Sequence, residues 1–347
     1  AHEFVRVLIK AKVPACGYAT YVLKKSEDTF TLRQMDTANC DLVGAEPAEW
    51  QCIEVPHEYV LENSRIKVSF DLQNASIVSF IDKRTGREMV KPGAYCGFRL
   101  IDEDTERGMT SWRVGRHMNV RPFGDVHIRP KWFSGAPLRQ MIEIEMRWRR
   151  SQLLAWVSLD EDSAVLRVDI QCNWHEVASD RLPQLSFVVP VAESCRQYRF
   201  DVPSGTLVRD EINLDLPGLS FIAAMPEKGG DTLMLSTDSK YGYRGFADSM
   251  AVNLIRSSCD PDPYPEYGIH KIKLAVSLLD SGNAGQMARH AFALWHPLNA
   301  LPAAAHEGSL PLSGSFLSLD NADIALEAVK LAEDGSGDWI VRLTDAA

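Results

Sequence analysis

Short runs in which apolar and polar residues alternate recur along most of the chain and predict β-strands. In residues 140–149, apolar residues alternate with charged ones, which is typical of a strand with one face on a core and one in water. Helical periodicity is almost absent, so we expect a mainly all-β chain built around a large antiparallel β-sandwich. The predicted strands are 66–72, 77–82, 97–101, 126–131, 140–149, 153–159, 165–174, 185–191, 198–202, 220–225, 233–236, 250–255 and 269–278.

One stretch, residues 284–295, has helical spacing instead. Met287, Ala291 and Leu294 recur at intervals of three to four residues, and Pro297 would stop the helix soon afterwards. We therefore expect one short helix beside the sandwich.

The strand pattern divides the chain into three parts. Residues 1–57 predict a small β unit or linker, residues 58–300 the large sandwich, and residues 301–347 a linker followed by an incomplete β unit. Strands of the first part are expected at 4–10 and 18–24, with loop and edge strand at 29–50, and strands of the last part at 316–319, 324–332 and 339–343. Because the chain begins without Met and stops directly after a strand, we expect it to be a fragment.

Composition narrows the classes of partner. The 347 residues are 45% hydrophobic and 24% charged, which is typical of globular proteins. The net charge of −10 argues against nucleic acid or an anionic membrane as partner, and no apolar run has the roughly 18 residues that a membrane helix needs. Seven scattered cysteines without a Cys-X-X-Cys pair favour a reducing, cytoplasmic setting.

Candidate binding chemistry gathers around one loop-rich stretch. Residues 257–268 contain three prolines and two aspartates, which excludes helix or central strand. Upstream, Lys240, Tyr241 and Tyr243 follow the strand at 233–236. A lysine and two aromatic rings on one exposed turn would suit a polar, ring-shaped ligand. The alternative is a structural corner of the sandwich.

The sequence contains no motif for a metal site, for nucleotide binding or for a serine nucleophile. The nine histidines include no His-X-His or His-Glu-X-X-His, so no metal site is predicted. No Gly-X-Gly-X-X-Gly, P-loop or Gly-X-Ser-X-Gly occurs, so neither nucleotide binding nor a serine nucleophile is predicted.

Four segments occur in the order and spacing seen in one enzyme family. Ser239 to Tyr243, Leu254 to Ser257, Pro261 to Pro263 and Gly268 to His270 together resemble the C-terminal region of the glycoside hydrolase family 38 α-mannosidases. The resemblance runs along nearly the whole chain but covers only the C-terminal half of a family enzyme. It implies a galactose-mutarotase-like supersandwich.

The resemblance also implies where the catalytic chemistry lies. Family enzymes cleave α-mannosides with retention, using an Asp nucleophile, a second carboxylate and a Zn²⁺ ion in an N-terminal barrel. The motifs of that barrel do not occur in this sequence. We therefore expect a non-catalytic part, with no catalytic residue, metal or other cofactor of its own, which packs on the missing N-terminal catalytic domain.

Single residues extend the resemblance to the substrate. Tyr95 in Pro92-Gly93-Ala94-Tyr95 resembles a family tyrosine that reaches the active site, and Trp112 resembles a tryptophan that follows a Glu-Asp segment. The alternative is that Tyr95 is an ordinary aromatic residue at the start of a strand and that Trp112 is a core residue. The candidate substrate-binding residues are Tyr95, Trp112, Lys240, Tyr241, Tyr243 and His270.

Two other functions stay open at this point. A free-standing carbohydrate-binding module would use Tyr241, Tyr243 and Trp112 as a stacking platform. An enzyme like aldose epimerase would need His175, Glu176 and His270 to converge. Exposed apolar surface left by missing neighbours would favour self-association, hence a homo-oligomer.

Overall fold

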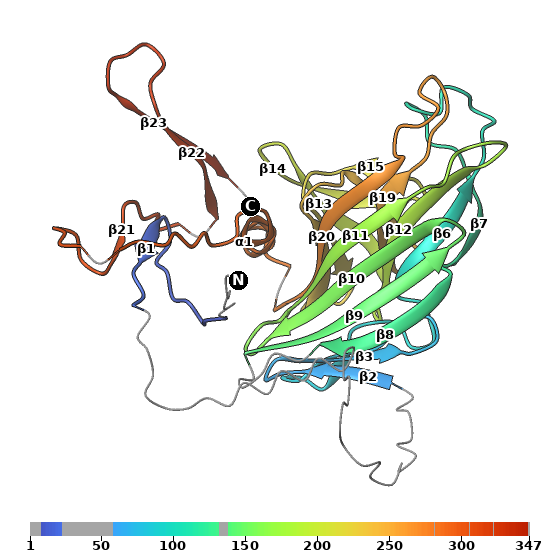
Figure 1. The fold of residues 1–347 in the computed structure, drawn as a ribbon, viewed down its shortest axis with the longest axis horizontal. Coiled ribbons are helices and arrows are strands. Elements are labelled where there is room, and N and C mark those ends of the chain that lie inside the picture. Colours follow the sequence, from blue (N-terminus) through green and yellow to red (C-terminus); the bar gives the residue numbers. More distant parts are fainter. Residues whose placement is uncertain are drawn as a thin grey trace, which may run out of the picture.

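Two antiparallel sheets stack and enclose one apolar core (Figure 1). The structure is a computed structural model that describes residues 8–22, 58–131, 138–280, 282–304, 306–321 and 323–345. The nine-stranded sheet contains, in spatial order, β14 (Gly205–Asp210), β13 (Cys195–Val202), β16 (Phe221–Pro226), β17 (Thr232–Thr237), β20 (Gly268–Leu279), β11 (Val165–Trp174), β10 (Ser151–Asp160), β9 (Arg139–Trp148) and β8 (Asp125–Lys131). The six-stranded sheet contains β15 (Leu216–Pro217), β18 (Gly242–Phe246), β19 (Ser249–Arg256), β12 (Leu182–Pro190), β6 (Gly97–Glu103) and β7 (His117–Pro122).

A third sheet adds to the same core. Its four strands are β2 (Glu58–Glu62), β3 (Ile66–Asp71), β4 (Ile77–Asp82) and β5 (Arg87–Glu88). Ile66, Val68 and Phe80 of this sheet are fully buried in one cluster with residues of the two larger sheets. The third sheet therefore belongs to the sandwich.

Alternation along the strands accounts for the core. In β11, Leu166, Val168 and Ile170 are buried, whereas Arg167 and Asp169 between them are exposed. Successive side chains of a strand point to opposite faces, so this pattern turns one face of the sheet inward.

Strand β12 departs from this pattern because all nine of its residues are buried. Its polar residues Gln184 and Ser186 are buried among other polar groups. Asn253 donates to Gln184 over 3.2 Å, and Arg99 donates to Ser186 over 3.4 Å. A buried polar layer is therefore part of the six-stranded sheet.

The helix α1 (Ala284–Trp295) has the predicted bounds. Its N-cap residue Asn283 accepts a hydrogen bond from the backbone of Gln286 over 2.8 Å, which satisfies one of the free N–H groups of the first turn. Met287 and Ala291 pack on β16, β17 and β20 in an apolar cluster separate from the main core. The helix thus covers the nine-stranded sheet on the side away from that core.

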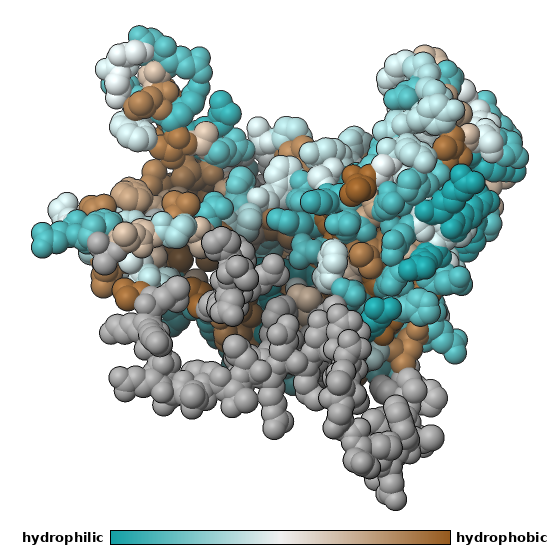
Figure 2. Space-filling view, in the orientation of Figure 1, coloured by the Kyte–Doolittle hydropathy of each residue, from teal (hydrophilic) through white to brown (hydrophobic). Residues whose placement is uncertain are grey.

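Two small ribbons lie beside the sandwich in Figure 1. One pairs β1 (Gly17–Ala19) with β21 (Ser313–Ser315), and the other pairs β22 (Ile324–Leu331) with β23 (Trp339–Asp345). Apolar side chains of these ribbons and of the segments next to them are exposed (Figure 2), among them Leu301, Phe316, Leu331, Trp339 and Leu343.

The predicted fold class is confirmed: the chain is mainly β, its sheets are antiparallel, and α1 is the one helix of the described residues. Strands not predicted are β2, β5, β7, β14, β15, β18 and β21. The division into three parts at residues 57 and 300 stays a prediction. Among the residues that the structure describes, no helix has the length and apolar character that crossing a membrane requires.

Predictions for the terminal parts fare less well. The strand predicted at 316–319 is wrong, because pairing with β1 places β21 at Ser313–Ser315 and the ring of Phe316 packs on Tyr18 at 5.5 Å. Residues 8–10 of the predicted strand 4–10 are not in a strand, and the rest of that strand lies outside the described residues. Of the strand predicted at 18–24, the structure contains only β1. Residues 23 and 24 lie outside the described residues, and so does the loop and edge strand predicted at 29–50.

Candidate functional site

Two connections meet at one end of the six-stranded sheet (Figure 1, upper right). They are the β6–β7 connection, residues 104–116, and the β19–β20 connection, residues 257–267. The backbone N–H of Ser111 donates to the carbonyl of Asp260 over 2.8 Å, and that of Met109 donates to the Asp260 carboxylate over 2.8 Å. The hydroxyl of Thr110 accepts from the backbone N–H groups of Cys259 and Asp260, each over 3.0 Å. These bonds fix the two connections to each other.

A buried ion pair anchors both connections to the sheet. Arg256 Nε lies 2.8 Å from Glu103 Oε2, and Arg256 Nη2 lies 2.6 Å from Glu103 Oε1. Glu103 has no exposed surface. Arg256 also donates to the carbonyls of Thr110 and Arg113, the latter over 2.9 Å, so one guanidinium group holds the sheet and the loop together.

A pocket of about 570 Å³ opens beside this loop, within the size range of small-molecule sites. The residues that line it, called the Trp112 pocket below, are Arg107, Trp112, Arg113, Val114, Leu214 and Asp215. Trp112 is 68% exposed, so its ring is free to stack on a ligand, which excludes the reading of Trp112 as a core residue. Its role in substrate binding stays a prediction.

A charged cluster adjoins the pocket. Arg244 is 3% exposed, and its Nε donates to Asp215 Oδ1 over 2.7 Å while Nη1 donates to Asn213 over 2.9 Å. The two ring nitrogens of His117 lie 3.0 and 2.9 Å from Arg244 Nη1 and Nη2. Burial, helped by the Arg244 charge, lowers the pKa of His117 to about 4, and burial lowers the pKa of Arg99 close by to about 10. His117 is therefore neutral at neutral pH.

Sequence reasoning missed Asp215, Arg244 and His117. Each stands alone in its own segment, so no spacing rule connects them. Arg244 does follow the Lys240 to Tyr243 segment directly, and this position was the one signal available.

Lys240 and His270 lie in a second polar group, around Glu266, and Tyr241 follows Lys240 directly in the sequence. Burial lowers the pKa of Lys240, and the Glu266 charge opposes that shift. His270 Nε2 lies 2.7 Å from the Glu266 carbonyl oxygen, and Nδ1 lies 3.7 Å from the Glu266 carboxylate. Tyr241 is 53% exposed. Contact of these three residues with substrate stays a prediction.

The prediction for Tyr243 is wrong, because this residue does not lie on an exposed turn. It belongs to β18 and is fully buried, and its hydroxyl lies 3.0 Å from that of Thr237. Gly218 leaves space for the ring, since a Cβ there would come within 2.9 Å of it. A stacking platform that includes Tyr243 is therefore excluded by its burial.

Tyr95 lies just before β6 and is largely buried. Its hydroxyl donates to the backbone carbonyl of Phe98, and burial raises the pKa of Tyr95 well above its usual value. These contacts explain Tyr95 as a packing residue, and its predicted place in a substrate wall stays a prediction.

The three residues that an epimerase would need are engaged separately. Glu176 accepts from Ser151 over 2.8 Å and is 7% exposed. The ring of His175 packs edge-on against Tyr267 with centroids 4.8 Å apart, and His270 contacts Glu266. Within the described part of the chain, no hydrogen bond or ion pair joins His175, Glu176 and His270 to one another.

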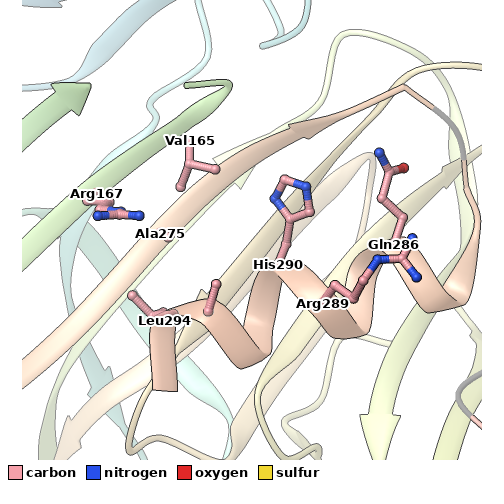
Figure 3. A pocket seen from close by; sticks show the side chains of 8 residues that line it. Val165, Arg167, Ala275, Gln286, Arg289, His290 and Leu294 are labelled. Atoms are coloured by element: carbon pink, nitrogen blue, oxygen red, sulfur yellow. The ribbon is translucent and has the colours of Figure 1, made fainter. Parts of the chain in front are cut away.

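A groove of about 440 Å³ lies between α1 and the strands β11 and β20 (Figure 3). Arg167, Arg289, His290 and Gln286 line it above an apolar floor. Burial and the charge of Arg289 lower the pKa of His290. Among the described residues that line this groove there is no Phe, Tyr or Trp, and no sequence motif points to it.

Metal ligands do not gather in the part of the chain that the structure describes. No three His, Cys, Asp or Glu side chains there converge as a group that could hold an ion. The zinc chemistry implied by the resemblance therefore does not fit these residues.

Comparison with known proteins shows the family to which the chain belongs. Residues 61–264, more than half of the chain, match the family model "Glycosyl hydrolases family 38 C-terminal domain". "Alpha-mannosidase G" of Dictyostelium discoideum is 20% identical, with 96% of this chain and 31% of that protein covered.

Two solved structures are also similar. An alpha-mannosidase from Enterococcus faecalis V583 is 16% identical with a TM-score of 0.67, covering 83% of this chain and 36% of that chain. A glycosyl hydrolase family 38 protein from Enterococcus faecalis is 16% identical with a TM-score of 0.68, covering 83% and 38%. At such identities the likeness shows a shared fold, and the chain spans about a third of the length of these relatives. The match over residues 61–264 shows that the chain belongs to the family of glycosyl hydrolase family 38 C-terminal domains.

Proposed function

We propose that this chain is the non-catalytic C-terminal part of an α-mannosidase, which packs on the catalytic domain and partly lines its pocket. The observation that carries the proposal is the family match over residues 61–264, in a chain that spans about a third of the length of its relatives. The substrates would be terminal α-mannosides, cleaved with retention by the complete enzyme.

Catalysis in this proposal lies outside the chain. A retaining glycosidase needs two carboxyl groups about 5 Å apart, and we place both of them in the catalytic domain. The zinc site would also lie outside, because no group of metal ligands converges among the residues described here. We therefore assign this chain neither an acid nor a nucleophile, and we expect it to be inactive alone.

The connections 104–116 and 257–267 are our candidates for the side that faces the catalytic pocket. They carry exposed aromatic rings, Trp112, Tyr264 and Tyr267, at 68%, 64% and 57% exposure. Rings of this kind are enriched where proteins bind partners and sugars. The seven scattered cysteines without a Cys-X-X-Cys pair support a cytoplasmic enzyme, and the exposed apolar residues near β22 and β23 support self-association.

The test is hydrolysis of an aryl α-mannoside by the purified chain, with and without added Zn²⁺. We expect no turnover under either condition, and we expect turnover from a longer polypeptide that joins this chain to its catalytic domain. Metal-dependent turnover by the chain alone would contradict the proposal and direct the search to His175, Glu176, Asp262 and His270.

A further inference from the structure

The groove between α1 and the strands β11 and β20 carries an arginine on each wall (Figure 3). Arg167 belongs to β11, and Arg289 belongs to α1. No Asp or Glu is among the described residues that line the groove. An anion that enters the groove would therefore meet two guanidinium groups and no carboxylate in the lining.

Carboxylates outside the lining are engaged by other arginines. Arg167 Nη1 lies 3.5 Å from Asp160 Oδ2, but the same Asp160 accepts two hydrogen bonds from Arg139. Two arginines thus share one carboxylate. Asp280, which lies shortly before α1, is 3.2 Å from Arg65 Nη2. The positive charge at the groove is therefore only partly offset.

Two uncharged side chains add hydrogen-bond donors. Burial and the Arg289 charge lower the pKa of His290, and the Asp280 charge opposes that shift. The imidazole is therefore neutral at neutral pH and keeps one N–H. The Gln286 Oε1 atom has no hydrogen-bond partner among the described residues, so no bond at that atom fixes the amide, whose NH₂ group can donate to a ligand.

We propose that this groove binds a phosphate monoester, with its phosphate group between Arg167 and Arg289 and its ester group on the apolar floor. A phosphate monoester carries about −1.5 to −2 charges near pH 7 and three strong acceptor oxygens, which match two guanidinium groups and the N–H donors beside them. A carboxylate has one charge and two oxygens, so it matches the two walls less well. The volume of about 440 Å³ leaves room for the ester group, to which Val165, Ala275 and Leu294 offer apolar contact.

Isothermal titration calorimetry of the 347-residue chain with phenyl phosphate at neutral pH tests the site. We expect saturable binding that weakens as salt is added, because the attraction is between charges. Phenol, benzoate and inorganic phosphate should each bind more weakly, since each lacks the dianionic head group or the apolar part. An affinity for any of these three that equals the affinity for phenyl phosphate would overturn the proposal.

Two arginines of the nine-stranded sheet form a matched pair of variants. Arg167 pairs with Asp160 at 3.5 Å and Arg129 pairs with Glu145 at 3.7 Å, and both side chains are about half exposed, at 44% and 55%. Arg129 does not line the groove. We expect Arg167→Gln to raise the Kd for phenyl phosphate about tenfold or more, because a hydrogen bond between charged groups is lost. Arg129→Gln should leave the Kd within about twofold, since solvent screens a distant charge.

Two alanines of α1 form a second pair. Ala293 lines the groove, whereas Ala288 lies on the same helix outside it, and neither is among the buried residues of α1. We expect Ala293→Glu to abolish saturable binding of phenyl phosphate, because it places a negative charge in the groove. Ala288→Glu should leave binding within about twofold of the unchanged chain.

The outcomes separate this site from the proposed function, on which it does not depend. If the unchanged chain shows no saturable binding of phenyl phosphate, or if the two variants of either pair bind alike, the groove is not a phosphate site, whatever the hydrolysis test shows. If Arg167→Gln does not fold, the Ala293→Glu and Ala288→Glu pair decides. Turnover of an aryl α-mannoside by the chain alone would contradict the proposed function and leave the phosphate site standing.

Discussion

Arg256 and Glu103 form a two-bond ion pair at a point where Glu103 has no exposed surface and the Arg256 side chain is 15% exposed. The two residues are 153 positions apart in the sequence. Because Arg256 also donates to carbonyls at Thr110 and Arg113, the pair determines the position of the β6–β7 connection. Such a pair is costly to break from one side, since the remaining charge stays buried.

Replacing one partner should therefore destabilise the fold strongly. We expect Arg256→Met to lower the free energy of unfolding by about 3–5 kcal/mol, and the double variant with Glu103→Met to recover most of that loss. Urea denaturation measures both. Lys330→Gln, which breaks the exposed pair with Glu333, is the control and should change little. A loss for Arg256→Met as small as that of the control would show that the pair is not structural.

The buried His117 should make stability depend on pH. Its pKa is about 4 in the folded chain, whereas an unfolded histidine titrates near 6.5. Between these values the unfolded chain binds a proton that the folded chain does not, so stability is full above pH 6.5 and falls as pH drops toward 4. The loss from this group is at most about 3 kcal/mol.

His117 faces Arg244 and Arg99, which lower its pKa, and Asp215, which raises it. We expect His117→Asn to flatten the curve of unfolding free energy against pH between 4 and 6.5, when measured by urea denaturation at a series of pH values. His290 also has a lowered pKa and should leave part of the slope. The exposed His306→Asn is the control, and an unchanged slope in His117→Asn would refute the assignment.

Two tyrosines two positions apart should respond differently to the same change. Tyr243 is buried and its hydroxyl contacts Thr237, so Tyr243→Phe should cost about 1 kcal/mol of unfolding free energy. Tyr241 is exposed, and Tyr241→Phe should stay within about 0.5 kcal/mol of zero. Thermal or urea unfolding distinguishes the two. Equal effects would contradict the burial of Tyr243.

Two glycines of β18 offer a test of packing. A Cβ at Gly245 would come within 2.9 Å of Tyr198 Cε2 and closer still to other atoms of that ring, which is fully buried. At Gly242 the nearest atom, Asn253 Cβ, would be 3.6 Å away. We expect Gly245→Ala to cost about 2–3 kcal/mol through overpacking and Gly242→Ala to cost less than 1 kcal/mol, roughly. Similar unfolding midpoints for the two variants would argue against this packing.

Local patterns predicted the elements whose stability is local. The helix at 284–295 has its own cap, Asn283, and a stop, Pro297, so its bounds could be read from neighbouring residues. The strand expected at 316–319 could not be placed this way. Its true position, Ser313–Ser315, depends on pairing with Gly17–Ala19.

The candidate site shows the same limit more strongly. Trp112 could be proposed as a site residue from its own segment. Asp215 and Arg244 become candidates only because the folded chain places them together beside the Trp112 pocket. The Tyr243 ring was misplaced because its burial depends on a space left by Gly218, which no periodicity along β18 reveals. A pocket made of side chains from two connections far apart in the sequence is a property of the folded chain, so sequence patterns predict its residues one at a time at best.

The ribbon of β1 and β21 joins segments that ribosomal synthesis releases at very different times. Ser315 donates to the carbonyl of Ala15 across 300 positions of sequence. Closing so large a loop is entropically costly unless the intervening chain is already folded and holds the two segments near each other. The sandwich therefore acts as a template for this ribbon, and Gly17–Ala19 must wait without a partner until Ser313–Ser315 has been made.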